Sequence, residues 1–324
     1  MAFFDLPLAE LDTYRPEVRR PDDFTEFWDT TLAQARAFDL DVTLTKVDTG
    51  LDLVDVYDME YSGFGGHRIK AWLTAPAGTD GPLPAVVEFV GYNGGRGLPH
   101  ENLLWANAGY IHVKMDTRGQ GSGWGNGGHT PDPVGSTPSV AGFMTRGITD
   151  PADYYYRRVY TDAVRAWEAT VSLDRVDPQR TAIAGISQGG GITLAAAGLL
   201  GDKVAAVLPD VPFLCNFERA TSITDADPFH EITAYLAVHR GEVDQVFTTL
   251  SYFDAVNFAP AASAPALFSV ALMDMICPPS TVFSAFNHYG HDDKDIVVYP
   301  YNGHEGGQIH QVARQLPWLR SRLA

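Results

Sequence analysis

The pentapeptide Gly185-Ile186-Ser187-Gln188-Gly189, near the middle of the chain, decides the fold. The residues before it, 181–186, are small, apolar and partly β-branched, which is typical of a short buried strand. The residues after it, 189–200, have the alanine and leucine content of a buried helix. The pentapeptide alone arises easily by chance, but a strand before it and a helix after it make chance a poor explanation. The pattern predicts a sharp turn that presents Ser187 at the start of a helix, where backbone N–H groups face a developing negative charge.

Composition and charge exclude several classes of protein. The chain has 324 residues, 45% of them hydrophobic, which is enough for a large core. Its 23 lysines and arginines stand against 40 aspartates and glutamates, and the net charge of −17 argues against nucleic acid or an anionic membrane as a partner. Cys215 and Cys277 lie in apolar stretches, so we expect buried free thiols rather than a disulfide framework. The sequence shows no secretory signal and no stretch long enough to span a membrane, so we expect a cytoplasmic protein.

Short apolar runs alternate with helical patterns along most of the chain. Residues 54–61 and 68–74 alternate in polarity and predict an antiparallel hairpin with one solvated face. The clearest helix pattern covers 156–173. Runs rich in β-branched residues predict parallel strands, buried on both faces, at 84–90, 110–115, 181–186, 204–208, 266–272 and 296–299.

This order of elements predicts a single α/β domain over residues 1–324, with a mostly parallel central sheet flanked by helices. Residues 1–45 form an N-terminal extension, whose helix at 21–38 is expected to pack on the main body. Residues 216–260 look helical and predict an insertion before the strand at 266–272, where a lid or an oligomer contact would lie. Together with the serine turn, this organisation predicts the α/β-hydrolase fold.

A serine nucleophile needs a base to accept its proton and an acid to orient that base. In the hydrolase fold the acid follows the serine along the chain, and the histidine follows the acid. His304 lies in a glycine-bounded loop directly after the last predicted strand, where it can face the serine turn. Asp274 and Asp210 each follow a predicted strand, and the residues alone leave both open as the acid. For Asp210 the other interpretation is a carboxylate that caps a turn.

The oxyanion of an acyl-transfer intermediate needs two N–H donors. One is expected from Gln188, directly after the nucleophile. The other is expected from the loop at 90–97, whose glycines let the backbone approach a ligand closely, and Tyr92 is the natural donor there. The alternative is a glycine-rich turn without a catalytic role.

Two further motifs do not predict a cofactor or a metal. Residues 123–128 match G-x-G-x-x-G, but the segment HTPDP that follows cannot open a helix. Residues 304–308 resemble a zinc-binding helix motif, but Gln308 stands where the second histidine should be and two glycines interrupt the motif. We therefore expect neither a cofactor nor a metal.

Several phrases together resemble the acetyl xylan esterase / cephalosporin-C deacetylase family, carbohydrate esterase family seven. They are GYNGGRG at 91–97, DTRGQG at 116–121, RGI at 146–148, YYYRR at 154–158, GISQG at 185–189, DVPFLC at 210–215, MDMICPPST at 273–281 and GHE at 303–305. The N-terminal stretch fits too, so the resemblance covers nearly the whole chain.

The resemblance implies Ser187 as nucleophile, Asp274 as acid and His304 as base, with Tyr92 and Gln188 as oxyanion donors. It also implies a doughnut-like homohexamer of intracellular subunits that remove small acyl groups from sugars and related alcohols. We read Arg118 and Gln120, which belong to its signature, as structural residues that order neighbouring loops.

These observations predict a serine esterase that removes acetyl groups from acetylated xylo-oligosaccharides and cephalosporin-C-type esters through an acyl-enzyme. Trp124, Phe213 and Ile276 follow strand ends beside the catalytic groups, and we expect them to wall a small acyl pocket that prefers acetyl. Ordinary core packing is the alternative for each of the three. The alternative functions are a broad short-chain carboxylesterase and a catalytically silent hydrolase fold that serves as a binding protein. A peptidase is a further alternative, but we expect no propeller-like extra domain that would select peptides.

Overall fold

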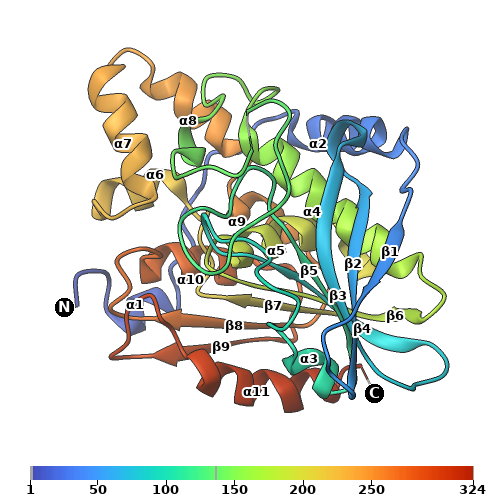
Figure 1. The fold of residues 1–324 in the computed structure, drawn as a ribbon. Helices are drawn as coiled ribbons and strands as arrows, with labels where there is room; N and C mark the ends of the chain where they lie inside the picture. Colours follow the sequence, from blue (N-terminus) through green and yellow to red (C-terminus); the bar gives the residue numbers. More distant parts are fainter. Residues whose placement is uncertain (1–2, 136, 324) are drawn as a thin grey trace.

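The computed structural model describes residues 3–135 and 137–323, and a nine-stranded sheet forms its centre (Figure 1). The strand order is β1-β2-β3-β5-β4-β6-β7-β8-β9. The pairs from β1 to β5 are antiparallel, and every later pair, beginning with β5 and β4, is parallel. This is the mostly parallel sheet that the sequence predicts. The strands are β1 Thr43–Val47, β2 Val54–Ser62, β3 Arg68–Pro76, β4 Leu83–Phe89, β5 Ile111–Met115, β6 Val176–Ile186, β7 Ala206–Asp210, β8 Ala266–Ala271 and β9 Lys294–Tyr299.

The antiparallel part of the sheet differs from the prediction in two ways. β1 had no predicted counterpart, because its residues are mostly exposed and carry no apolar run. The prediction of one solvated face is wrong for β3, which lies between β2 and β5 and is buried on both faces. The short helix α3, Leu104–Asn107, covers the face expected to be wet, where Trp72 packs against Ala106.

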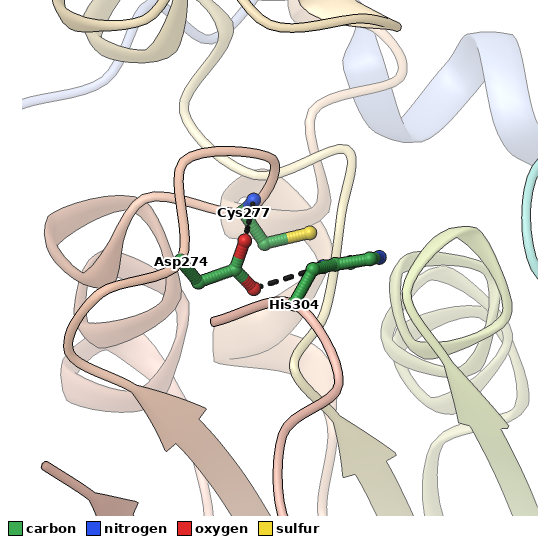
Figure 2. A group of neighbouring side chains, drawn as sticks. All are labelled: Asp274, Cys277 and His304. Atoms are coloured by element: carbon green, nitrogen blue, oxygen red, sulfur yellow. Dashed lines mark hydrogen bonds and ion pairs between the residues drawn. The ribbon is translucent and has the colours of Figure 1, made fainter. Parts of the chain in front are cut away.

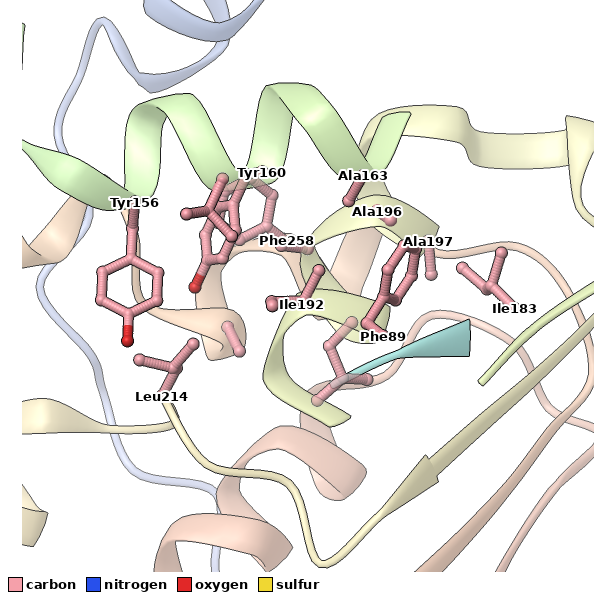
Figure 3. Close-up of a cluster of buried hydrophobic side chains, with 14 of the residues drawn as sticks. Phe89, Tyr156, Tyr160, Ala163, Ile183, Ile192, Ala196, Ala197, Leu214 and Phe258 are labelled. Carbon is pink, nitrogen blue, oxygen red and sulfur yellow. The ribbon is translucent and has the colours of Figure 1, made fainter. Parts of the chain in front are cut away.

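The helices on the opposite face of the sheet from α3 include two that pack against each other. These are α4, Tyr155–Val171, and α5, Gln188–Leu200, and both are largely buried. Between them and the sheet lies a core cluster that contains Phe89 of β4, Tyr160 of α4 and Ile192 of α5 (Figure 3). This packing fixes where α5 begins, and α5 begins directly after Ser187.

The predicted N-terminal helix is α2, Phe24–Arg36, and it packs on the main body. The ring of Trp28 lies 5.8 Å from that of Tyr160 and 5.4 Å from that of Phe258. The indole N–H of Trp28 also donates to the carbonyl of Tyr252 at 2.9 Å. Aromatic packing with a satisfied polar edge therefore joins the extension to the core.

The segment predicted as a helical insertion runs between β7 and β8. It contains α6 Phe217–Ile223, α7 Phe229–Val238, α8 Val243–Ser251 and α9 Ala255–Phe258. In Figure 1, α6, α7 and α8 gather at the upper left, away from the hairpin of β2 and β3. The other α-helices are α1 Leu8–Leu11, α10 Pro279–His288 and α11 Gln308–Arg320. Across the described ranges, none of the helices combines the length and apolar character that crossing a bilayer requires.

Candidate active site

Ser187 lies in a strained turn between β6 and α5. Its φ of 56° and ψ of −119° fall where side-chain-bearing residues are rare. The flanking glycines are required by close backbone contacts: a Cβ on Gly185 would lie 2.3 Å from the carbonyl carbon of Gly189, and one on Gly189 would lie 2.1 Å from the carbonyl oxygen of Phe89. The Ser187 N–H donates to the carbonyl of Asp210 at 3.0 Å, which holds the turn against β7.

A hydrogen-bonded triad is formed by Ser187, His304 and Asp274. His304 Nε2 lies 3.0 Å from Ser187 Oγ, and His304 Nδ1 lies 2.9 Å from Asp274 Oδ2. Asp274 follows β8 and His304 follows β9, and their side chains face each other in Figure 2, with the Cys277 thiol beside them. Asp274 is fully buried, and its Oδ1 accepts the N–H groups of Ile276 at 2.8 Å and Cys277 at 2.9 Å. The carboxylate is therefore held so that its other oxygen can orient the imidazole.

Asp210, the other candidate acid, has different partners. Its carboxylate accepts the hydroxyl of Ser269 on β8, and the same hydroxyl accepts the N–H of Val211. Burial raises the pKa of Asp210 to about 6, although the Ser269 hydroxyl and the nearby His304 act in the opposite direction. Asp210 thus joins β7 to β8, and Asp274 is the carboxylate that accepts the hydrogen bond from His304.

The backbone N–H groups of Tyr92 and Gln188 are the predicted oxyanion donors, and that role stays a prediction. Neither N–H is hydrogen-bonded to another of the described residues. The peptide after Tyr92 is fixed at both ends: the Tyr92 carbonyl accepts the indole N–H of Trp124 at 2.7 Å, and the Asn93 N–H donates to Gln120 Oε1 at 2.6 Å. An oxyanion requires N–H donors that have no other partner, and among the described residues both of these groups meet that requirement.

A pocket of about 490 Å³ opens at Ser187. Of the three residues expected to wall it, Trp124 and Ile276 do line it, but Phe213 does not. The expectation for Phe213 is wrong, because its side chain is 1% exposed and packs with its ring centre 4.3 Å from that of Phe229. The lining residues are Gly91, Tyr92, Asn93, Gly123, Trp124, Ala141, Ile186, Ser187, Asp227, Pro228, Glu231, Ile276, His304 and Glu305.

Comparison with protein families identifies the chain. The family model for acetyl xylan esterase matches residues 1–322. The chain belongs to the acetyl xylan esterase family. Membership of this family places it among the carboxylic ester hydrolases, as the resemblance of its motifs predicts.

Three individual proteins illustrate the family and the fold. The acetyl xylan esterase from Paenibacillus sp. R4 is 38% identical, and the match covers 98% of this chain and 100% of that one with a TM-score of 0.91. The acetyl esterase Axe7A from Xylanibacter ruminicola is 27% identical, and the match covers 95% of this chain and 69% of that protein. The α/β hydrolase GrgF from Penicillium sp. sh18, at 19% identity, matches 82% of this chain and 98% of its own with a TM-score of 0.58, and confirms the α/β-hydrolase fold alone.

Within this acetyl xylan esterase family member, Arg118 and Gln120 have separate structural tasks. Arg118 is buried and makes a bidentate pair with Asp162, at 2.6 and 2.7 Å. Gln120 braces the site itself. Its side-chain amide pairs reciprocally with that of Gln188, at 2.9 and 3.1 Å, while its Oε1 also accepts the Asn93 N–H. Gln120 therefore connects Gln188 to the peptide that follows Tyr92.

Glu231 was not predicted as a site residue, but it lines the pocket and accepts a hydrogen bond from the Tyr92 hydroxyl at 2.5 Å. The two residues are 139 positions apart, and no local pattern announces their contact. The sequence indicated only that Glu231 lies in the segment 216–260, which was expected to be helical.

Asp274, Cys277 and His304 also offer three potential metal ligands within 4.8 Å of one another. An ion at this point would have to displace the hydrogen bond between His304 and Asp274. Burial raises the pKa of the Cys277 thiol, which disfavours the thiolate that binds metal. The donor set therefore fits a proton relay better than a metal site.

Proposed function

We propose that this protein is a serine esterase that removes acetyl groups from acetylated sugars, such as xylo-oligosaccharides, through an acyl-enzyme intermediate. The observation that carries the proposal is the hydrogen-bonded triad of Ser187, His304 and Asp274, because Ser187 and His304 line a pocket. Membership of the acetyl xylan esterase family supports the choice of ester.

In the acylation step, Ser187 Oγ attacks the ester carbonyl while His304 Nε2 accepts its proton. Asp274 holds the Nδ1–H tautomer of His304 and stabilises the imidazolium that forms. The Tyr92 and Gln188 amides bind the oxygen on which negative charge develops, and each such donor contributes about 3 kcal/mol in comparable enzymes. His304 then returns the proton to the departing sugar hydroxyl, which leaves an acetyl ester on Ser187.

In the deacylation step, a water molecule takes the place of the alcohol. His304 removes a proton from the water, and the resulting nucleophile attacks the acetyl carbonyl on Ser187. The same two amides hold the second oxyanion. Collapse of this intermediate releases acetate and restores the Ser187 hydroxyl, so the reaction needs no group beyond water.

The charges around the pocket favour an uncharged alcohol. Apart from His304, the ionisable side chains that line it include the carboxylates of Asp227, Glu231 and Glu305. They repel anionic leaving groups, and the chain's net charge of −17 adds to this repulsion. Cephalosporin-C-type esters, which carry a carboxylate, therefore belong in the proposal as slower substrates than neutral acetylated sugars.

A broad short-chain carboxylesterase is the second candidate, because the pocket of about 490 Å³ exceeds the volume of an acetyl group and Phe213 does not narrow it. A panel that varies the alcohol at constant acyl group, and then the acyl chain at constant alcohol, separates the two. The proposed function requires acetyl xylo-oligosaccharides to exceed simple alkyl acetates in kcat/KM; equal values across the alcohols favour the broad esterase.

The experiment that tests the proposal compares the wild type with Ser187→Ala in acetate release from acetylated xylo-oligosaccharides. The variant should fold normally and lose activity by about 10⁴-fold or more. A folded Ser187→Ala protein with most of its activity would overturn the mechanism. A wild type that neither hydrolyses acetates nor reacts with a serine-directed phosphonate would favour the binding-protein alternative.

The homohexamer and the cytoplasmic location also remain proposals. The family resemblance implies both, since it implies a homohexamer of intracellular subunits. Light scattering and cell fractionation test them separately from the chemistry.

A further inference from the structure

The side chain of Tyr92 is held by the helical insertion. Its hydroxyl donates to Glu231 Oε1 at 2.5 Å and accepts the backbone N–H of Phe143 at 2.9 Å. Glu231 lies in the first turn of α7, so the contact joins the loop after β4 to the insertion. Both side chains are partly buried at the pocket wall.

Glu231 also holds the turn that packs against Tyr92. Its Oε1 accepts the N–H of Gly142 at 3.0 Å, and its Oε2 accepts the N–H of Met144 at 3.0 Å. The ring of Phe143, between these two residues, contacts the Tyr92 ring edge to face at 5.6 Å. One carboxylate therefore joins three segments that are far apart in the sequence.

Only a group that accepts hydrogen bonds at both ends suits this position. Glu231 faces the phenol O–H and two backbone N–H groups, which are all donors. A glutamine has the same shape but carries an NH₂ at one end, which would meet a donor and leave it unsatisfied. Burial and the neighbouring Glu231 raise the pKa of Tyr92, so the phenol keeps the proton that it donates.

The contacts on Tyr92 fix its backbone from three directions. Trp124 holds its carbonyl, Gln120 holds the next N–H, and Glu231 holds its side chain. The Tyr92 N–H, in contrast, has no hydrogen-bond partner within residues 3–135 and 137–323. We propose that Glu231 is a positioning residue for the oxyanion hole: through the Tyr92 phenol it fixes the direction of the Tyr92 N–H, and it makes the insertion part of the catalytic apparatus.

This inference rests on the proposed function, since it assigns Glu231 to the transition state of ester hydrolysis. Donors act fully only when they are fixed before the charge develops, and a small displacement forfeits much of their effect. Loosening Tyr92 should therefore lower kcat and leave KM nearly unchanged, because the ground-state ester does not need the N–H.

The test compares Glu231→Gln and Tyr92→Phe with the wild type, using 4-nitrophenyl acetate and a boronic acid that binds serine as a tetrahedral anion. Each variant should lose about tenfold in kcat, with KM changed by less than about threefold. Boronate affinity should fall in parallel with kcat. The double variant should lose no more than the worse single variant, because both changes break one connection.

The chain offers a matched control. Tyr235 donates to Glu242 at the same 2.5 Å, and this pair lies on the insertion but outside the pocket lining. Tyr235→Phe and Glu242→Gln should leave kcat and boronate affinity unchanged.

Wild-type kcat reports on the proposed function, and the variants report on Glu231 alone. Folded Glu231→Gln and Tyr92→Phe proteins with wild-type kcat and boronate affinity would overturn the inference, as would an equal loss of kcat in the control pair. If Glu231→Gln does not fold, Tyr92→Phe, which removes one hydroxyl, decides the question by the same two readouts.

Discussion

The two buried aspartates beside the serine turn differ because their partners differ. Asp274 receives two backbone N–H groups on one oxygen and His304 on the other, so its charge is well solvated by the protein. Asp210 receives the hydroxyl of Ser269, and its burial raises its pKa to about 6. The same side chain at the ends of adjacent strands therefore has two roles, and each role predicts a different response to mutation.

Replacing Asp274 should abolish turnover, and the matched change at Asp210 should not. Asp274→Asn offers an NH₂ to His304 Nδ1 and favours the wrong tautomer, so kcat should fall by about 10⁴-fold. Asp210→Asn keeps an oxygen for Ser269 and should retain most of the wild-type kcat. Steady-state kinetics with 4-nitrophenyl acetate measure both, and similar losses in the two variants would reverse the assignment of the acid.

Asp210 should also make stability depend on pH. Its pKa is about 6 in the folded chain and about 4 in the unfolded chain, so the folded state binds the extra proton between these values. The free energy of unfolding should therefore fall as the pH rises from about 4 to 6. Asp210→Asn removes this contribution and should exceed the wild type by about 2–3 kcal/mol at pH 7, with the difference vanishing near pH 4. Urea unfolding at several pH values measures it, and a constant difference would exclude the explanation.

At the scale of elements, the loops that follow β7 and β8 place their large apolar side chains in different surroundings. The loop after β8 brings Ile276 to the pocket beside the Asp274 carboxylate. The loop after β7 turns inward, with left-handed backbone at Val211 and Leu214, and carries Phe213 into the core. Being next to a strand end is therefore insufficient to place a side chain in the site.

This difference predicts separate effects for two truncations. Ile276→Ala should enlarge the acyl pocket and raise kcat/KM for butyrate relative to acetate, because each methylene that is accommodated gains about 0.8 kcal/mol. Phe213→Ala should leave acyl preference unchanged and cost about 3–5 kcal/mol of stability, as expected for a buried phenylalanine. Acyl-chain panels and denaturant unfolding measure these effects. An acyl preference that changes in Phe213→Ala would show that Phe213 contributes to the acyl pocket.

The elements that could be predicted from the sequence are those with a local signal. The strand, serine turn and helix around Ser187 have one, and so do the apolar runs of the parallel strands. Exposed β1 lacks one, and the covered face of β3 depends on α3, which comes later in the chain. The contact between Glu231 and Tyr92 depends on tertiary packing across 139 positions, so no sequence pattern could indicate it.

At the scale of the whole molecule, one sheet brings the site together. β4, β6, β8 and β9 are parallel, and the loops at their carboxyl ends supply Tyr92, Ser187, Asp274 and His304. The insertion adds Glu231 from the same side. The family resemblance further predicts that six such chains assemble into a homohexamer, so light scattering should give six times the mass of one chain at micromolar concentration. A monomer would contradict that prediction and leave the chemistry untouched.

Ser187 is proposed to carry the acetyl group during turnover, and mass spectrometry of its peptides tests this proposal most directly. The protein is mixed with excess 4-nitrophenyl acetate, quenched in acid within the first turnover and digested. The peptide that contains Ser187 should gain the mass of one acetyl group, and the same peptide of Ser187→Ala should not. Active wild-type protein with no acetyl adduct on that peptide, or with the adduct on another residue, would contradict the proposal that Ser187 is acetylated during turnover.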